Sequence, residues 1–178
     1  MKRFIPLMGL AVMLIAGISG CGETRSPEDE KLLKEAFGFH EETLESLETA
    51  ERALGMANTT ASRLDSLLAL SGISGPVDSI QQVLTSARTQ LESLQADLEE
   101  VEGNIAEVPG FEHEHHHDHD HGHEHHHHGG NSLEGLPANE VLDIQKAQFE
   151  AVTGIAKQGM AETKELNSLI QLVLAANK

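Results

Sequence analysis

A regular spacing of apolar residues between positions 77 and 108 restricts the fold of this chain more than any other feature. Ten positions alternate three and four residues apart: Val77, Ile80, Leu84, Ala87, Leu91, Leu94, Leu98, Val101, Ile105 and Val108. Because an α-helix repeats about every 3.6 residues, this spacing places all ten on one face and is typical of a coiled coil. Such a face must be buried against another helix. The pattern predicts a helix that Pro109 and Gly110 terminate.

The segment before this helix carries a less regular pattern. Ser26 is a candidate helix cap, and Pro27 suits the first helical position. The apolar face first follows Leu33, Phe37, His40, Leu44 and Leu47, and then a shifted register of Ala50, Leu54, Ala57, Ala61, Leu64 and Leu68. The shift is compatible with one locally overwound helix of over forty residues, or with two helices that meet near residues 55–60. The glycine-rich residues 71–76 then predict a turn.

A third helical segment is expected from near Pro137 to about Ala176. Its apolar face consists of Leu142, Phe149, Val152, Ala156, Leu166, Ile170 and Val173, and is interrupted by Gln145, Gly159 and Thr163. The small residues Ala156, Gly159 and Thr163 either let a neighbouring helix come close or weaken this seam. Together the segments predict an all-α fold, an antiparallel up-down-up bundle of three, or else four, long helices spanning residues 27–176.

A histidine-rich tract separates the second and third helical segments. Of the sixteen residues from His113 to His128, eleven are histidine, and the others are Glu114, Asp118, Asp120, Gly122 and Glu124. The tract has no apolar side chain, so it cannot offset the entropy of ordering its own backbone. We therefore expect residues 109–136 to interrupt the bundle as a disordered loop.

The tract offers ligands for divalent transition metals, because imidazole nitrogens and carboxylate oxygens both coordinate them. The candidate ligands are His113, His115, His116, His117, His119, His121, His123, His125, His126, His127, His128, Asp118 and Asp120. Such tracts chelate Zn²⁺, Ni²⁺, Co²⁺ or Cu²⁺, and the lack of cysteine or methionine nearby argues against Cu(I). Many overlapping sets of four ligands predict several exchanging ions. An alternative interpretation is a hydrophilic spacer.

In composition the tract resembles the histidine-rich loops of zinc-uptake solute-binding proteins, zinc transporters and nickel chaperones. The resemblance is limited to the tract. It implies metal handling with a transport protein as partner. A purification tag is a poor explanation, because the tract is internal and interspersed with acidic residues.

Lys2 and Arg3 precede an apolar stretch of fifteen residues, Phe4 to Ile18. A bilayer-spanning helix needs about twenty apolar residues, so residues 1–20 are expected to be a secretory signal. The stretch ends in Ile18-Ser19-Gly20-Cys21, which resembles the lipobox of bacterial lipoproteins. The resemblance implies that cleavage makes Cys21 the first residue and that acyl chains, palmitate among them, attach to it.

On this resemblance the protein belongs in the bacterial cell envelope, held to a membrane by the acyl chains, with residues 21–26 as a tether. Gly22 follows the cysteine. By the sorting rule of enterobacterial lipoproteins, the absence of aspartate there implies the outer membrane, facing the periplasm, in a Gram-negative host. Cys21 is the only cysteine in the sequence, which excludes disulfides within the chain. The resemblance implies that its sulfur is acylated, which leaves no thiolate for chemistry.

The charge balance narrows the classes of partner. The formal charge is −17, and removal of residues 1–20, with two basic residues and no acidic one, changes it to −19. Such a chain is unsuited to binding nucleic-acid phosphates. It has no tryptophan or tyrosine, and no phosphate-binding loop or nucleophile motif, so we do not expect an enzyme.

His40 is the one histidine outside the tract and lies on the apolar stripe of the first helix. It is expected to be a packed core residue; the alternative is a ligand that the loop reaches in a metal sensor. Two broader hypotheses remain. The first is an envelope lipoprotein that binds zinc, or next nickel, for buffering or delivery. The second is a structural or adaptor lipoprotein that binds a partner or forms a homo-oligomer through its helical seam.

Overall fold

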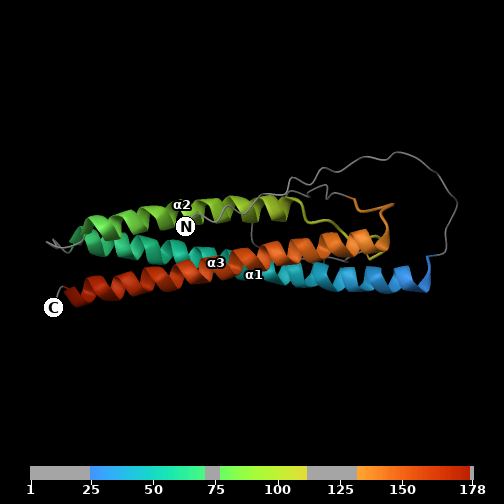
Figure 1. Cartoon of the computed structure of the whole chain (residues 1–178), viewed down its shortest axis with the longest axis horizontal. Coiled ribbons are helices and arrows are strands. Elements are labelled where there is room, and N and C mark those ends of the chain that lie inside the picture. Colours follow the sequence, from blue (N-terminus) through green and yellow to red (C-terminus); the bar gives the residue numbers. More distant parts are fainter. Residues whose placement is uncertain (1–24, 71–76, 112–131, 177–178) are drawn as a thin grey trace, which may run out of the picture.

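The protein is a bundle of three helices in the computed structural model, which describes residues 25–70, 77–111 and 132–176. The helices are α1 (Pro27–Leu70), α2 (Val77–Gly103) and α3 (Ala138–Ala176). They lie along a common axis, with α1 and α3 running in one direction and α2 in the other (Figure 1). The all-α fold and its up-down-up order are therefore confirmed, with no strand among the described residues.

The first helix is continuous, and the predicted shift in its register is wrong. Its 44 residues would extend about 66 Å at about 1.5 Å per residue. A buried stripe keeps the three-four spacing from end to end: Leu33, Ala36, His40, Thr43, Leu47, Ala50, Leu54, Ala57, Ala61, Leu64 and Leu68. Ala53 is buried beside this stripe. Ala36 and Thr43 occupy the buried positions, whereas the larger Phe37 and Leu44 lie half-buried at the edge of the seam. The helix therefore needs no overwinding.

Ser26 caps α1 as predicted. Its hydroxyl oxygen accepts a hydrogen bond from the backbone N–H of Asp29 at 3.1 Å and donates one to the Asp29 carboxylate at 2.7 Å. This satisfies a backbone donor that the first turn of a helix leaves without an internal partner.

The second helix is shorter than its apolar spacing predicts, ending at Gly103 and not at Pro109. Glycine is a poor helix former, and the Asn104 side chain donates a hydrogen bond to the Glu100 carbonyl at 2.7 Å, competing with continuation of the helix. Ile105 and Val108 lie in the irregular segment that follows, where Val108 is nevertheless buried. The apolar spacing correctly identified six buried residues: Leu84, Ala87, Leu91, Leu94, Leu98 and Val108. Ile80, Val101 and Ile105 are only half-buried, and the spacing extended the helix too far.

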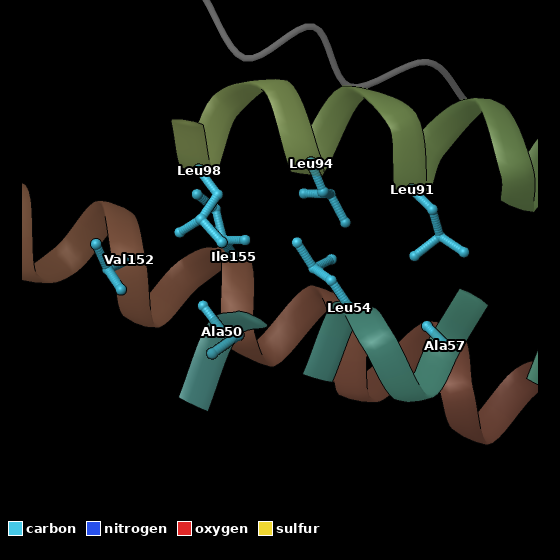
Figure 2. Packing of buried hydrophobic residues seen from close by; sticks show 9 residues of the cluster. Ala50, Leu54, Ala57, Leu91, Leu94, Leu98, Val152 and Ile155 are labelled. Atoms are coloured by element: carbon cyan, nitrogen blue, oxygen red, sulfur yellow. The ribbon is translucent and has the colours of Figure 1, made fainter. Parts of the chain in front are cut away.

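Three groups of buried side chains fill the bundle in succession. The middle group joins Leu91, Leu94 and Leu98 of α2 to Ala50, Leu54 and Ala57 of α1 and to Val152, Ile155 and Ala156 of α3. Figure 2 shows the three α2 leucines projecting between α1 and α3. A second group holds together the beginnings of α1 and α3, and a third holds their last turns against the beginning of α2. We refer to the end of the bundle where α1 and α3 begin as the tract end.

Small residues bring α1 and α3 into close contact. A Cβ atom at Gly159 would lie 3.2 Å from both the backbone carbon and the Cβ of Ala53, and 3.3 Å from a Leu54 methyl. Gly159 is buried, and α1 occupies the space that a side chain at this position would need. Of the two interpretations of the small residues on the third helix, close approach is the correct one.

Candidate functional site

The thirteen candidate metal ligands of the histidine tract lie outside the described residues, as does the candidate lipidation site Cys21. The structure describes the chain up to Phe111 on one side of the tract and from Ser132 on the other. These two flanks determine where the tract is attached to the bundle.

The first flank, residues 104–111, crosses from α2 to α3 and is held there by two glutamines. Gln148 donates a hydrogen bond from its side-chain amide to the Asn104 carbonyl, and Gln145 donates one to the Ala106 carbonyl, both at 2.7 Å. Gln145 is fully buried. A buried carbonyl without a partner is costly, so this glutamine is what allows the irregular segment to enter the core.

The last residues of the first flank are held by α1 and by the residue that precedes its cap. The Phe111 ring stacks on Phe37 with centroids 4.9 Å apart. The Arg25 guanidinium donates a hydrogen bond to the Pro109 carbonyl at 3.2 Å. Gly110 has a φ of +83°, and a Cβ there would lie 2.6 Å from the same guanidinium, so glycine suits this position both for its backbone and for its lack of a side chain.

The second flank, residues 132–137, returns to the same end of the bundle. Leu133 is buried in the group formed by the beginnings of α1 and α3, although the sequence placed it within the predicted loop. Both flanks of the tract are therefore fixed at the tract end, close to Arg25, which follows Cys21 by four residues.

The tract end also contains an aromatic and charged contact between α1 and α3. The Lys146 ammonium lies 3.0 Å from a Glu35 carboxylate oxygen and 5.3 Å from the centroid of the Phe39 ring, which in turn contacts Phe149. Phe149, expected on the buried face, is half-buried in this contact. The ion pair is exposed and contributes little stability, but it ties the two parallel helices together beside the flanks.

His40 is buried, with 3% of its surface exposed, and its ring lies 6.4 Å from that of Phe37. The packed-core interpretation of this histidine is confirmed. Within residues 25–70, 77–111 and 132–176, no group of three or more His, Cys, Asp or Glu side chains could hold a metal ion.

One carboxyl group of the bundle, that of Glu162, has a shifted pKa. Burial, together with the neighbouring Glu165, raises the pKa of Glu162 above its ordinary value. It lies in the second half of α3, whereas the tract attaches at the beginning of that helix. Glu162 therefore does not belong with the candidate metal ligands.

Sequence reasoning identified the tract but not the residues that fix its ends. In the sequence, Gln145 was interpreted only as an interruption of an apolar face, and Arg25 as part of a tether. A polar residue at a buried heptad position is the signal that could have identified Gln145, because it must find a hydrogen-bond partner in the core. No signal in the sequence linked Arg25 to Pro109, 84 residues away.

No helix of the described residues is both long and apolar enough to cross a bilayer. Comparison of the chain with protein-family models, with curated proteins and with solved structures finds no match.

Proposed function

We propose that this protein is a lipid-anchored protein of the bacterial envelope that binds divalent transition metal through the tract His113–His128. Zinc is the favoured ion and nickel the next. The metal would be buffered there or delivered to a transport protein. The observation that carries the proposal is the composition of the tract, eleven histidines in sixteen residues with carboxylates between them.

The attachment of the tract supports delivery at a membrane surface. Its flanks lie at the tract end, beside Arg25. Four residues of extended chain span at most about 14 Å, so an acyl anchor on Cys21 would hold the tract end close to the lipid headgroups. A transport protein in the same membrane would then be within reach of the tract, while the other end of the bundle points away.

Ligand exchange is the mechanism that fits this arrangement. An ion held by a few imidazoles among many equivalent sets can pass from one set to the next without full dissociation. A partner with a closed site of higher affinity would then take the ion. The bundle's part is to hold the two ends of the tract in place.

Calorimetric titration of the soluble chain beginning at Gly22 tests the proposal, with Zn²⁺, Ni²⁺ and Cu²⁺ in competition with a mild chelator. We expect more than one ion to bind with submicromolar affinity, and deletion of residues 112–128 to abolish this binding. A matched control replaces the eleven tract histidines by asparagine, which keeps the length and the acidic residues. Binding too weak to compete with the chelator would favour the spacer interpretation, and binding that survives in the asparagine variant would assign it to the carboxylates.

The placement of the tract end is tested with the lipidated protein in vesicles that carry nitroxide-labelled headgroups. A fluorophore on Glu134→Cys, an exposed position in the second flank, should be quenched strongly. A fluorophore on Ser66→Cys, exposed near the other end of α1, should be quenched weakly, because about 60 Å of helix separates it from Arg25. Equal quenching at the two positions would contradict a bundle that stands away from the membrane.

A further inference from the structure

A shallow open groove runs between α1 and α3 and is not lined by α2. Its lining consists of Arg52, Gly55, Met56, Thr59 and Thr60 from α1, and of Thr163 and Asn167 from α3. The groove lies beyond the contact of Gly159 with Ala53, in the half of the bundle away from the tract. It is separate from the proposed metal site in both position and residues.

The floor of the groove is more apolar than its residue types suggest. The hydroxyls of Thr59, Thr60 and Thr163 each donate to the backbone carbonyl one turn earlier, at 2.9, 2.8 and 2.9 Å. Their hydroxyl donors are thus used within their own helices, and their methyl groups remain for contact. Met56 adds a flexible apolar side chain that is 46% exposed. With no side chain at Gly55, a backbone can approach closely.

One further exposed residue on each helix extends this surface: Met160 on α3 and Arg63 on α1. Met160 precedes Thr163 by three residues and Asn167 by seven, so it lies on the same face of α3 and is 47% exposed. Arg63 follows Met56 by seven residues and Thr59 by four, which places it beside the groove on α1. Met160 therefore lengthens the apolar floor on α3, and Arg63 lengthens the border of the groove on α1, so that the surface covers several helical turns.

The border of the groove is positively charged in a chain whose formal charge is −17. Arg52 and Arg63 lie on the α1 side, and Lys157 and Lys164 follow the α3 side, seven residues apart from each other. None of the four forms an ion pair with another described residue, whereas two cations at other helix contacts do: Arg88 with Asp65 at 2.9 Å and Lys146 with Glu35 at 3.0 Å.

Acidic residues return to these faces only toward the tract end. Glu48 precedes Arg52 by four residues and Glu45 precedes it by seven, and Glu150 precedes Lys157 by seven. The positive border thus coincides with the apolar floor. Four unpaired cations beside an apolar groove complement a helix that has one apolar face and acidic residues on either side of it.

We infer that this groove docks an acidic amphipathic helix of a partner protein, forming a local four-helix arrangement. Helix-in-groove recognition places apolar anchors at three- and four-residue spacing into such a surface. The arginines and lysines would mainly set specificity and the association rate, because exposed charges add little affinity. The inference is independent of the proposed metal binding.

A second copy of this chain is a poorer occupant. A symmetric contact between two such grooves would oppose the four cations to themselves. The outer face of α2 is acidic, with Glu92, Asp97, Glu99, Glu100 and Glu102 exposed, but its docking in a neighbour's groove would be a head-to-tail contact that need not close.

The test uses a synthetic helical peptide of about five turns, with leucine and alanine on one face and glutamate on both sides of it. Amide shifts of the soluble chain beginning at Gly22 are followed by NMR during titration. We expect saturable shifts at Gly55, Met56, Thr59 and Thr163. Arg52→Glu/Arg63→Glu should weaken binding about tenfold, whereas Lys31→Glu/Lys34→Glu, the same charge change on exposed residues at the tract end, should change it less than twofold. A peptide with lysine in place of glutamate should bind at least about tenfold more weakly.

Each of the following results would overturn the inference. One is equal weakening by the two double variants, which would indicate a response to net charge alone. Another is the absence of saturable shifts in the groove, or shifts confined to α2. Sedimentation of the peptide-free chain as an oligomer that Arg52→Glu/Arg63→Glu dissociates would assign the groove to a second copy. Binding to phosphatidylglycerol vesicles that needs the same arginines, without peptide binding, would assign it to a lipid surface. Circular dichroism should show that Arg52→Glu/Arg63→Glu and Lys31→Glu/Lys34→Glu are both folded.

Discussion

Lowering the pH from 7.5 to 5.5 is expected to reduce the zinc affinity of the soluble chain by about a hundredfold to ten-thousandfold. Imidazole takes up a proton with an ordinary pKa near 6.5, and a metal ion competes for the same nitrogen. Over these two pH units the neutral fraction of each free imidazole falls about tenfold. An ion held by two to four imidazoles therefore loses about one factor of ten for each of them. Affinity is full above the imidazole pKa and is lost as the pH falls through it.

The measurement is a chelator competition at several values between pH 7.5 and 5.5, corrected for the protonation of the chelator. The variant with asparagine at the eleven tract histidines provides the control, because its residual binding should follow carboxylate protonation and change little above pH 5. A decrease of less than about tenfold in the unaltered chain would show that carboxylates, and not imidazoles, supply most of the ligands.

Replacement of Gly159 by leucine should lower the free energy of unfolding by about 3 kcal/mol. The first added carbon would already lie 3.2 Å from the backbone of Ala53, and the remaining three carbons would have to separate α1 from α3. That separation would disturb the packing of Leu54 and Val152 in the middle of the bundle. Urea denaturation followed by circular dichroism measures the change.

Gly154→Ala is the matched control on the same helix. A Cβ at Gly154 meets nothing within 4 Å, so alanine should stabilise the protein by about 1 kcal/mol through its higher helix propensity. If leucine at position 159 were tolerated as well as alanine at 154, the close contact between α1 and α3 would not be a determinant of stability.

The sequence predicted the helices of this fold better than their contacts. The all-α class, the cap at Ser26 and the order of the helices all followed from spacing and helix signals. The register of α1 did not, because Ala36 and Thr43 are too small or too polar to be recognised as core positions beside Phe37 and Leu44. In a bundle where α1 and α3 are in close contact, small residues occupy the centre of the seam and larger ones its edges.

The candidate sites differ in how far a sequence can reveal them. The metal-binding prediction for the tract depends on composition alone and needs no fold. The groove depends on how α1 and α3 are rotated relative to each other, which the spacing of apolar residues within each helix does not determine. The positive charges at positions 52, 63, 157 and 164 are unremarkable in the sequence and form one border only after the two helices pack side by side.

The flank from Asn104 to Phe111 also determines how the bundle would respond to a pull on the tract. Side-chain donors hold its carbonyls at Pro109, Ala106 and Asn104 in turn, from Arg25, Gln145 and Gln148. Tension from the tract would break these hydrogen bonds one after another, beginning with the bond from Arg25 to Pro109. The leucine seam of α2 begins only beyond the last of them. Ala106 and Val108 are buried among the beginnings of α1 and α3, so a pull on the tract would open that end of the core before it reached the seam.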